Sequence, residues 1–344
     1  MPNRATALLV VAVLIALGSA GAARAGGAVQ RIAGDDPVGL SVAVSTATFD
    51  DAGADGTAAL HAVLGRDDAF ADSLAAGPLL AGGPLLYVPG GEGGTLPAAV
   101  ADELVRVLPP GATVYLAGGT AAVAPAVEDA VADLELLPIR LGGEERTATA
   151  ARIAEEAVAL YGDPATVLLA AAGTWPDAIA GAALAAATSG ADGAVPILLT
   201  DGGALSPAAG EFLDAAGEVE VLVLGGDAVI DDAVAESAGA DGRLAGPTRA
   251  HTAAVIAPAF GDDPAAATVV QGWVDDPQVE GTDDGWIEGT VAATLLRPLL
   301  LTGPSADEVN EPTRAALSGR QAVTVVGAPD RVSDGGLEAI GAAR

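Results

Sequence analysis

The sequence predicts an α/β protein made of three tandem Rossmann-like domains, each a small open parallel sheet covered by helices. Apolar residues make up 51% of the 344 residues and aromatic residues only 3%, so the cores must consist mainly of Ala, Val, Leu and Ile. Strand-like apolar segments alternate with alanine-rich helical segments, which is typical of βαβ units. The same ordered set of short motifs also recurs three times along the chain.

Each copy opens with an arginine followed closely by a glycine. These arginines, Arg31, Arg140 and Arg243, lie 109 and 103 residues apart. An alanine-rich helix, an apolar strand, an aromatic-x-acid signature, a short buried strand and a strand ending in a glycine turn then follow in order. The signatures are Phe70-Ala71-Asp72, Trp175-Pro176-Asp177 and Trp286-Ile287-Glu288, and the turns begin at Gly118, Gly225 and Gly327. Five ordered motifs in three copies indicate internal repeats.

The motifs divide the chain into copies at residues 29–136, 137–239 and 240–344, the last of them diverged. Linkers between the copies are short, so we expect the three domains to pack together about a pseudo-threefold axis. The repeats occupy nearly all of the mature chain, and we therefore expect no separate catalytic domain.

The N-terminal segment, residues 1–25, has the features of a cleaved signal peptide. Arg4 provides the positive charge, residues 7–17 form an apolar core, and Ala23-Arg24-Ala25 places small residues before the cut. An uncleaved membrane anchor is the alternative, but the apolar stretch is short for a membrane span. No later apolar run reaches membrane length, so we expect a secreted mature protein without a transmembrane segment.

The protein is strongly acidic, with a net charge of −31, and all fifteen basic residues are Arg. Removal of Arg4 and Arg24 leaves thirteen Arg against 46 acids, a charge of −33. Nucleic acid is excluded as a partner, because binding phosphates needs a basic surface. The composition suits either adaptation to high salt or a GC-rich genome. Cysteine is absent, which excludes disulfides and thiol chemistry.

Taken together, these motifs resemble the type 2 cell-wall-binding repeat family. The second copy matches nearly throughout, with Arg140, Gly143, Arg146, Thr149-Ala150, Trp175-Pro176-Asp177-Ala178, Ile197-Leu198-Leu199-Thr200 and Gly225-Gly226. The first copy has Asp36-Pro37-Val38 in place of the expected Arg segment. The third has Glu288 for Asp and Gly327-Ala328 for Gly-Gly. The resemblance implies three modules that attach a secreted protein to a Gram-positive cell wall by recognising anionic secondary polymers of the teichoic or polysaccharide type.

Arginines that recur in the copies are the candidate polymer-binding residues: Arg31, Arg140, Arg146, Arg243 and Arg249. A guanidinium group pairs bidentately with phosphate or carboxylate and does not lose its charge. The alternative is a structural ion pair that holds a helix against an acid of the neighbouring copy.

The repeated acids Asp72, Asp177 and Glu288 invite a catalytic interpretation, because acids that follow strands often line α/β clefts. An acid at the start of a helix also complements the helix dipole, and the preceding Phe70, Trp175 or Trp286 resembles a hydrophobic staple. We therefore predict a helix-capping role. The glycine turns suit tight connections, with phosphate binding as the alternative.

The sequence predicts no metal or catalytic centre and no cofactor. His61 and His251 cannot form a zinc site alone, and we expect them to be surface or packing residues. A P-loop is excluded because there is no Lys, and no Gly-x-Ser-x-Gly elbow is present. The acidic stretch from Asp275 to Glu288 has the oxygen ligands that Ca²⁺ prefers, but a solvated loop is the simpler interpretation.

These observations favour a secreted, non-catalytic protein of the cell surface that binds an anionic cell-wall polymer. The principal alternative is a secreted protein that binds a small ligand in an inter-domain cleft, which a single large pocket would favour. The sequence is less consistent with a wall hydrolase, since it contains neither zinc ligands nor a separate catalytic domain. A structural wall protein whose partner is another protein is also compatible with the repeats.

Overall fold

The computed structural model describes residues 29–190, 192–261, 265–272, 285–303 and 305–344. The predicted signal peptide and most of the acidic stretch, residues 275–284, lie outside the described residues. In the described part of the chain, twelve strands form three parallel sheets of four strands each, with helices between the strands. The predicted α/β fold of three parallel-sheet units is therefore confirmed.

Each sheet has the same strand order, with the second strand of the unit at one edge and the first strand inside it. The first sheet contains β3 (Leu85–Val88), β2 (His61–Arg66), β4 (Thr113–Ala117) and β5 (Leu137–Leu141). The second contains β7 (Ile197–Thr200), β6 (Thr166–Ala171), β8 (Glu220–Leu224) and β9 (Gly242–Leu244). The third contains β11 (Leu299–Leu301), β10 (Ala266–Val270), β12 (Ala322–Val326) and β1 (Val29–Ile32).

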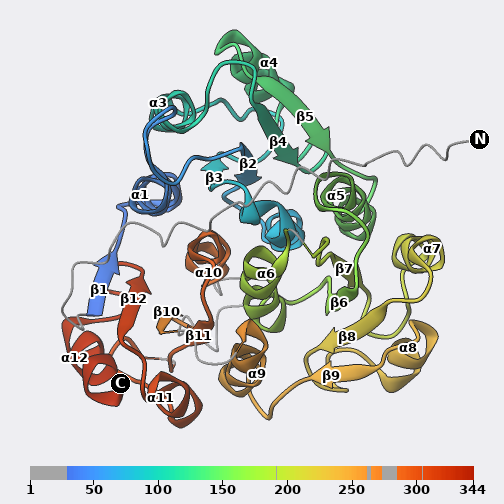
Figure 1. Cartoon of the computed structure of the whole chain (residues 1–344), viewed down its shortest axis with the longest axis vertical. Coiled ribbons are helices and arrows are strands. Elements are labelled where there is room, and N and C mark those ends of the chain that lie inside the picture. The colour runs from blue at the N-terminus through green and yellow to red at the C-terminus, as the bar shows by residue number, and fades with distance from the viewer. Residues whose placement is uncertain (1–28, 191, 262–264, 273–284, 304) are drawn as a thin grey trace, which may run out of the picture.

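The sheets are offset by one strand from the sequence copies. The strand that opens the second copy, β5, pairs with β4 of the first unit, and β9 pairs with β8 of the second. The strand that opens the first copy, β1, pairs with β12 of the third unit, in the register Val29 with Val323 to Ile32 with Val326. Figure 1 shows the blue β1 beside the red β12. The chain therefore closes into a ring, since its N-terminal strand completes the C-terminal sheet.

The helix after each opening strand joins neighbouring units. These helices are α1 (Pro37–Thr48), α5 (Arg146–Tyr161) and α9 (Arg249–Ile256). Helix α1 packs on β3 and on α10 (Trp286–Ala292) of the third unit. Helix α5 packs in the same way on β7 and on α2 (Ala71–Ala75), and α9 packs on β11 and on α6 (Pro176–Thr188). Each unit is therefore fastened to the next by a helix as well as by a strand.

The centre of the molecule is one apolar core shared by all three units. It is built around α2 with the 3-10 segment η1 (Gly77–Ala81), α6, and α10 with η3 (Ala293–Leu295). Figure 1 shows α6 and α10 in the middle of the three units. Small residues permit this close approach: a Cβ atom on Gly77 would lie 2.8 Å from the Cα atom of Ala182 in α6. The abundance of Ala and Gly and the scarcity of aromatic residues thus follow from helices that meet at short distance.

The outer faces of the sheets are covered by separate, smaller cores, one per unit. The covering helices are α3 (Ala98–Val107), α4 (Pro125–Asp133), α7 (Pro207–Ala216), α8 (Asp232–Ser237), α11 (Glu311–Leu317) and α12 (Asp334–Ala343), and the short segment η2 (Ala257–Phe260) extends α9. The strands are almost wholly apolar because helices cover them on both faces.

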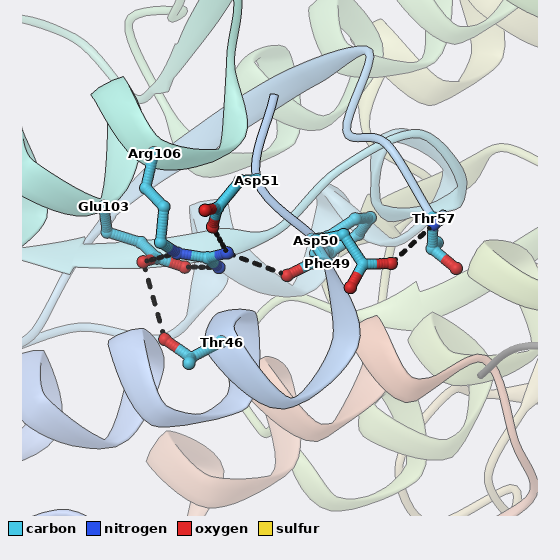
Figure 2. A network of polar contacts seen from close by, with 7 residues as sticks. All are labelled: Thr46, Phe49, Asp50, Asp51, Thr57, Glu103 and Arg106. Carbon is cyan, nitrogen blue, oxygen red and sulfur yellow. Dashed lines mark hydrogen bonds and ion pairs between the residues drawn. The ribbon is translucent and has the colours of Figure 1, made fainter. Parts of the chain in front are cut away.

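On the outer side of the first unit, Arg106 ties α3 to the end of α1 (Figure 2). Its guanidinium group donates at 2.7 Å to each carboxylate oxygen of Glu103, and at 3.0 Å to the Phe49 carbonyl and to Asp51. Glu103 is 4% exposed, and its hydrogen bonds raise the pKa of Arg106. This network satisfies the buried carboxylate and fixes the turn that leads toward β2.

The close contact at the centre makes a prediction about Gly77. Substitution Gly77→Ala places a methyl group against the backbone of Ala182, and we expect the free energy of unfolding to fall by about 1–3 kcal/mol, as in other overpacked cores. Urea unfolding monitored by circular dichroism measures this. The matched control is Gly93→Ala, since a Cβ atom at that exposed glycine meets nothing within 4 Å. Equal stabilities of the two variants would contradict the tight central packing.

Candidate functional site

The carboxyl ends of the strands carry the repeated polar residues, at the junctions where one unit meets the next. In each sheet the chain order reverses between the first and third strands of the unit, and ligands of open α/β sheets bind outside such points. The three predicted acids all lie there, each beside the glycine that ends the third strand. Gly118, Gly225 and Gly327 have φ angles of +116°, +97° and +136°.

These glycines are needed for space as well as for conformation. A Cβ atom on Gly118 would lie 2.7 Å from a carboxylate oxygen of Asp72, and one on Gly225 would collide with Asp177. At Gly327 the nearest atom of Glu288 would be its Cγ, at 3.5 Å. The longer side chain of Glu288 thus coincides with a looser fit at the third junction.

A threonine from the following copy hydrogen-bonds the acid at the first two junctions. Thr149 bonds Asp72, and Thr252 bonds Asp177. Each threonine oxygen also accepts from a backbone amide of its own loop, Gly143 or Gly246, at 3.1 Å. Burial raises the pKa of both acids, while the threonine and a nearby Arg146 or Arg249 act in the opposite direction. The acid of one unit is thus held by residues of the next.

The acids do not serve as side-chain caps. Phe70, Trp175 and Gly285 occupy the N-cap positions of α2, α6 and α10, and none makes a capping hydrogen bond through its side chain. The acids lie within the first turn instead, where a carboxylate still complements the helix dipole. The aromatic residues of the signature belong to the central packing: the rings of Phe70 and Trp286, from different units, have centroids 6.3 Å apart.

The opening arginines Arg31, Arg140 and Arg243 bind the glycine turns from within the protein. Their guanidinium groups donate to the carbonyl oxygens of Gly327, Gly118 and Gly225 at 2.8, 3.1 and 2.8 Å. Each also pairs with an acid on the following helix, at 3.5 Å for Asp334, 2.7 Å for Glu128 and 3.0 Å for Asp232.

Arg140 and Arg243 therefore use most of their donors in holding the fold, whereas Arg31 makes one hydrogen bond and the ion pair. Arg140 and Arg243 donate in addition to the carbonyls of Val123 and Ile230, the fifth residue after each turn glycine. The structural ion pair considered from the sequence describes this geometry more closely than a free binding site does.

The helix-start arginines lie inside the junctions. Arg146 donates to the Ala172 carbonyl at 2.8 Å and acts electrostatically on Asp72. Arg249 donates to the Gly272 carbonyl at 2.6 Å, and its guanidinium group lies 5.1 Å from the ring centroid of Trp175. These two predicted residues are thus brought to the acids, whereas Arg31, Arg140 and Arg243 lie behind the glycine turns.

The third junction keeps an arginine but takes it from another position. Pro37 and Leu40 stand where the other copies have the arginine and the threonine. Arg331, four residues after the turn glycine, forms an ion pair of 3.1 Å with Glu288, which is buried. The sequence alone did not single out Arg331. Its position just after the Gly327-Ala328 turn could have indicated that it lies at the junction.

Among the residues that the structure describes, cavities open at the first and third junctions. The first is about 240 Å³ and is lined by residues that include Arg66, Asp72, Glu144, Glu145, Arg146 and Thr149. The third-junction cavity is about 190 Å³, and each of its ten lining residues occupies a position equivalent to one that lines the first. Arg66, which was also not singled out from the sequence, is the last residue of β2. A charged residue at the end of a buried strand could have indicated that it lines the junction.

The two histidines have packing and surface roles in the structure. The ring of His61 is buried, lies 2.6 Å from the Leu79 carbonyl and meets Tyr115 edge-on; burial lowers its pKa. His251 lies on α9 beside Thr248. Over the described ranges, His, Asp and Glu side chains form no group of three suited to a metal. No helix among the described residues has the length and apolar character of a membrane span.

Comparison with known proteins identifies the family. The model of the family "Cell wall binding domain 2 (CWB2)" matches residues 31–128 and 140–235, more than half of the chain. The chain therefore belongs to the cell wall binding domain 2 family, a class of cell-wall-binding surface proteins. The third copy, residues 240–344, lies outside the matched residues, but its strands form the same four-stranded sheet together with β1.

Two solved structures share this fold. Cwp8 from Clostridium difficile is 23% identical, with a TM-score of 0.75 over 92% of this chain and 51% of that one. Cwp6 from Clostridium difficile is 21% identical, with a TM-score of 0.71 over 92% of this chain and 48% of that one. The chain thus spans about half the length of these proteins. No curated protein matches the sequence.

The hydrogen bond between Thr149 and Asp72 gives a prediction. Thr149→Val keeps the side-chain shape but leaves the carboxylate without this partner, and we expect a loss of about 1–3 kcal/mol in unfolding free energy at pH 7. The part of the loss that comes from Asp72 applies to the ionised acid, whereas the part that comes from the Gly143 amide, which loses its acceptor, is independent of pH. Because the variant raises the folded-state pKa of Asp72 further, the deficit should shrink as the pH falls through that pKa.

Urea unfolding at pH 7 and at stepwise lower pH measures both effects. The control is Thr188→Val, whose hydroxyl donates to the Leu184 carbonyl of its own helix. A Thr149→Val deficit that does not depend on pH, or that matches the control, would show that the Asp72 contact is not what holds this junction.

Proposed function

We propose that this protein is a secreted, non-catalytic module that attaches non-covalently to an anionic secondary polymer of a Gram-positive cell wall. The observation that carries the proposal is the arginine placed beside the acid at each junction of a cell wall binding domain 2 protein: Arg146, Arg249 and Arg331. Guanidinium groups suit phosphate and carboxylate, the charged groups of such polymers. The N-terminal segment, with the pattern of a signal peptide, supports secretion.

A non-catalytic role is supported by the contacts of the repeated acids. Asp72 and Asp177 are held by threonine hydroxyls and arginines of the neighbouring copy, and Glu288 is paired with Arg331. These contacts favour fixed carboxylates, which at the first two junctions join neighbouring units. A general acid or base instead needs to exchange a proton with a substrate within hydrogen-bond reach.

The net charge of −33 after signal removal opposes any polyanion at long range. At physiological ionic strength the Debye length is about 8 Å, so acids farther away are largely screened. Contacts between arginine donors and the polymer act within that length. Attachment should therefore depend on local guanidinium groups, or on divalent cations that bridge carboxylates to the polymer.

A small-ligand function has one observation in its favour, a cavity of about 550 Å³ between α5 and α7. Its lining combines alanines and Phe212 with the charged residues Arg152, Glu155 and Glu211. It lies between the joining helix α5 and the outer helix α7 of the second unit, and the repeated arginines and acids do not line it. The junction cavities are smaller than the roughly 300–1,000 Å³ of drug-sized ligand pockets, and so suit single groups of a polymer better than whole ligands.

Cosedimentation with purified Gram-positive walls tests the proposal. We expect the mature protein to sediment with intact walls and to remain in solution after hydrofluoric acid has removed the phosphodiester-linked polymers. Binding through arginine should weaken as salt rises and be indifferent to chelators, whereas cation bridging should require Ca²⁺. No sedimentation with walls of the source organism at any salt or Ca²⁺ concentration would overturn the proposal and favour the small-ligand alternative.

A further inference from the structure

We propose that the three junctions are unequal, and that the first alone receives the anionic group of the polymer, between Arg66 and Arg146. This inference rests on the proposed function and specifies its site. The chemical class we assign is an anionic oxygen group flanked by hydroxyls, such as a sugar or polyol phosphate.

In the described part of the chain, the first junction is the one where two arginines line one junction cavity. Arg66 ends β2 and Arg146 begins α5, and both line the cavity of about 240 Å³ and act on Asp72. At the equivalent strand ends the other units have Ala171 and Gln271. The pair thus arises from two copies of the repeat, one arginine from each.

Both arginines keep donors for a ligand. Arg66 uses Nε and Nη2 in a bidentate pair with Asp68, and Arg146 uses Nη1 for the Ala172 carbonyl. Among the described residues these bonds leave Nη1 of Arg66, and Nε and Nη2 of Arg146, able to donate. Donors from two guanidinium groups on one cavity match the several acceptor oxygens of a phosphate.

The acids that line the same cavity determine which groups of the ligand can lie next to the anion. Asp72 is already bonded by Thr149 and lies in the field of both arginines. Glu144 and Glu145 line the cavity and are exposed to solvent, which screens their charge. Exposed carboxylates accept hydrogen bonds, so hydroxyl groups next to the anion are the complementary partners. A bare anion would lack this second set of contacts.

The other junctions are occupied by their own side chains. At the third, Arg331 pairs with buried Glu288, and Pro37 replaces the helix-start arginine. At the second, Arg249 makes the same carbonyl bond as Arg146, here to Gly272, and in addition lies over the Trp175 ring. In both places the arginine is engaged by a side chain of the junction, and the second arginine of the first junction is missing from the equivalent strand end.

Variants at each junction test the inequality. We expect the double variant R66Q/R146Q to bind walls about tenfold or more weakly, because it loses charge-assisted contacts with the polymer. R249Q, at a junction without a second arginine, should lose much less binding than the double variant. The matched control is R152Q, which removes an exposed arginine from the same helix as Arg146 and leaves the cavity intact.

A second pair of variants leaves every arginine in place. Ala121→Trp fills the mouth of the first cavity from an exposed position, and Asp330→Trp does the same at the equivalent place of the third. Ala121→Trp should weaken wall binding and Asp330→Trp should not. Thermal unfolding of each variant confirms that it is folded.

Soluble competitors distinguish the source of the charge. Poly(glycerol phosphate) should displace the wild type from walls, and polygalacturonate, which carries carboxylates, should do so less well. Undiminished binding by R66Q/R146Q and by Ala121→Trp, or an equal loss in R249Q, overturns this inference and leaves the proposed function intact. Failure of the wild type to bind walls overturns both.

Discussion

Pairing between β1 and β12 holds the two ends of the described chain in one sheet, and the rest of the architecture depends on it. Without β1 the third sheet has three strands, and α1 loses the strand that leads it onto β3 and α10. The other units are joined in the same way. Strands β5 and β9 each complete the sheet of the preceding unit, and helices α5 and α9 each pack on that unit. Three such joints enclose one shared apolar core, so each unit depends on both neighbours for its packing.

The polar residues meet at the junctions because a strand and a helix of one copy pack on the preceding unit. At the first two junctions a glycine turn and an acid come from one unit, and a threonine and an arginine come from the next, so these junctions exist only when the units are assembled. At the third, Glu288 and its partner Arg331 come from the same unit. Arg140 and its equivalents fix the glycine turn from behind, while Arg146 and its equivalents face the acid. Repetition alone would make three equal sites. Divergence at Arg66, Pro37 and Arg331 instead gives each junction its own balance of charge.

Much of the fold could be predicted from the sequence, because repeats with strand and helix periodicity constrain a parallel α/β unit strongly. The offset between sheets and copies could not, because β1 and β5 have the same motif whichever sheet they join, and pairing across the chain ends is set by tertiary packing. The acids lie in the first turns of their helices without the predicted side-chain caps, and their bonds to Thr149 and Thr252 are contacts between copies. Arg66 and Arg331 were missed since neither recurs in the repeat.

Ring closure is tested most directly by a cross-link in this cysteine-free chain. Gln30 and Thr324 are Cα partners in β1 and β12, and their side chains are hydrogen-bonded at 3.0 Å. Gln30→Cys with Thr324→Cys should form an intramolecular disulfide quantitatively under mild oxidation, detected by loss of free thiols, with wall binding unchanged. The comparison is Gln30→Cys with Leu137→Cys, which places the second cysteine on the exposed edge strand of the first sheet. Absence of the first disulfide, or formation of the second, would contradict closure of the ring through the third unit.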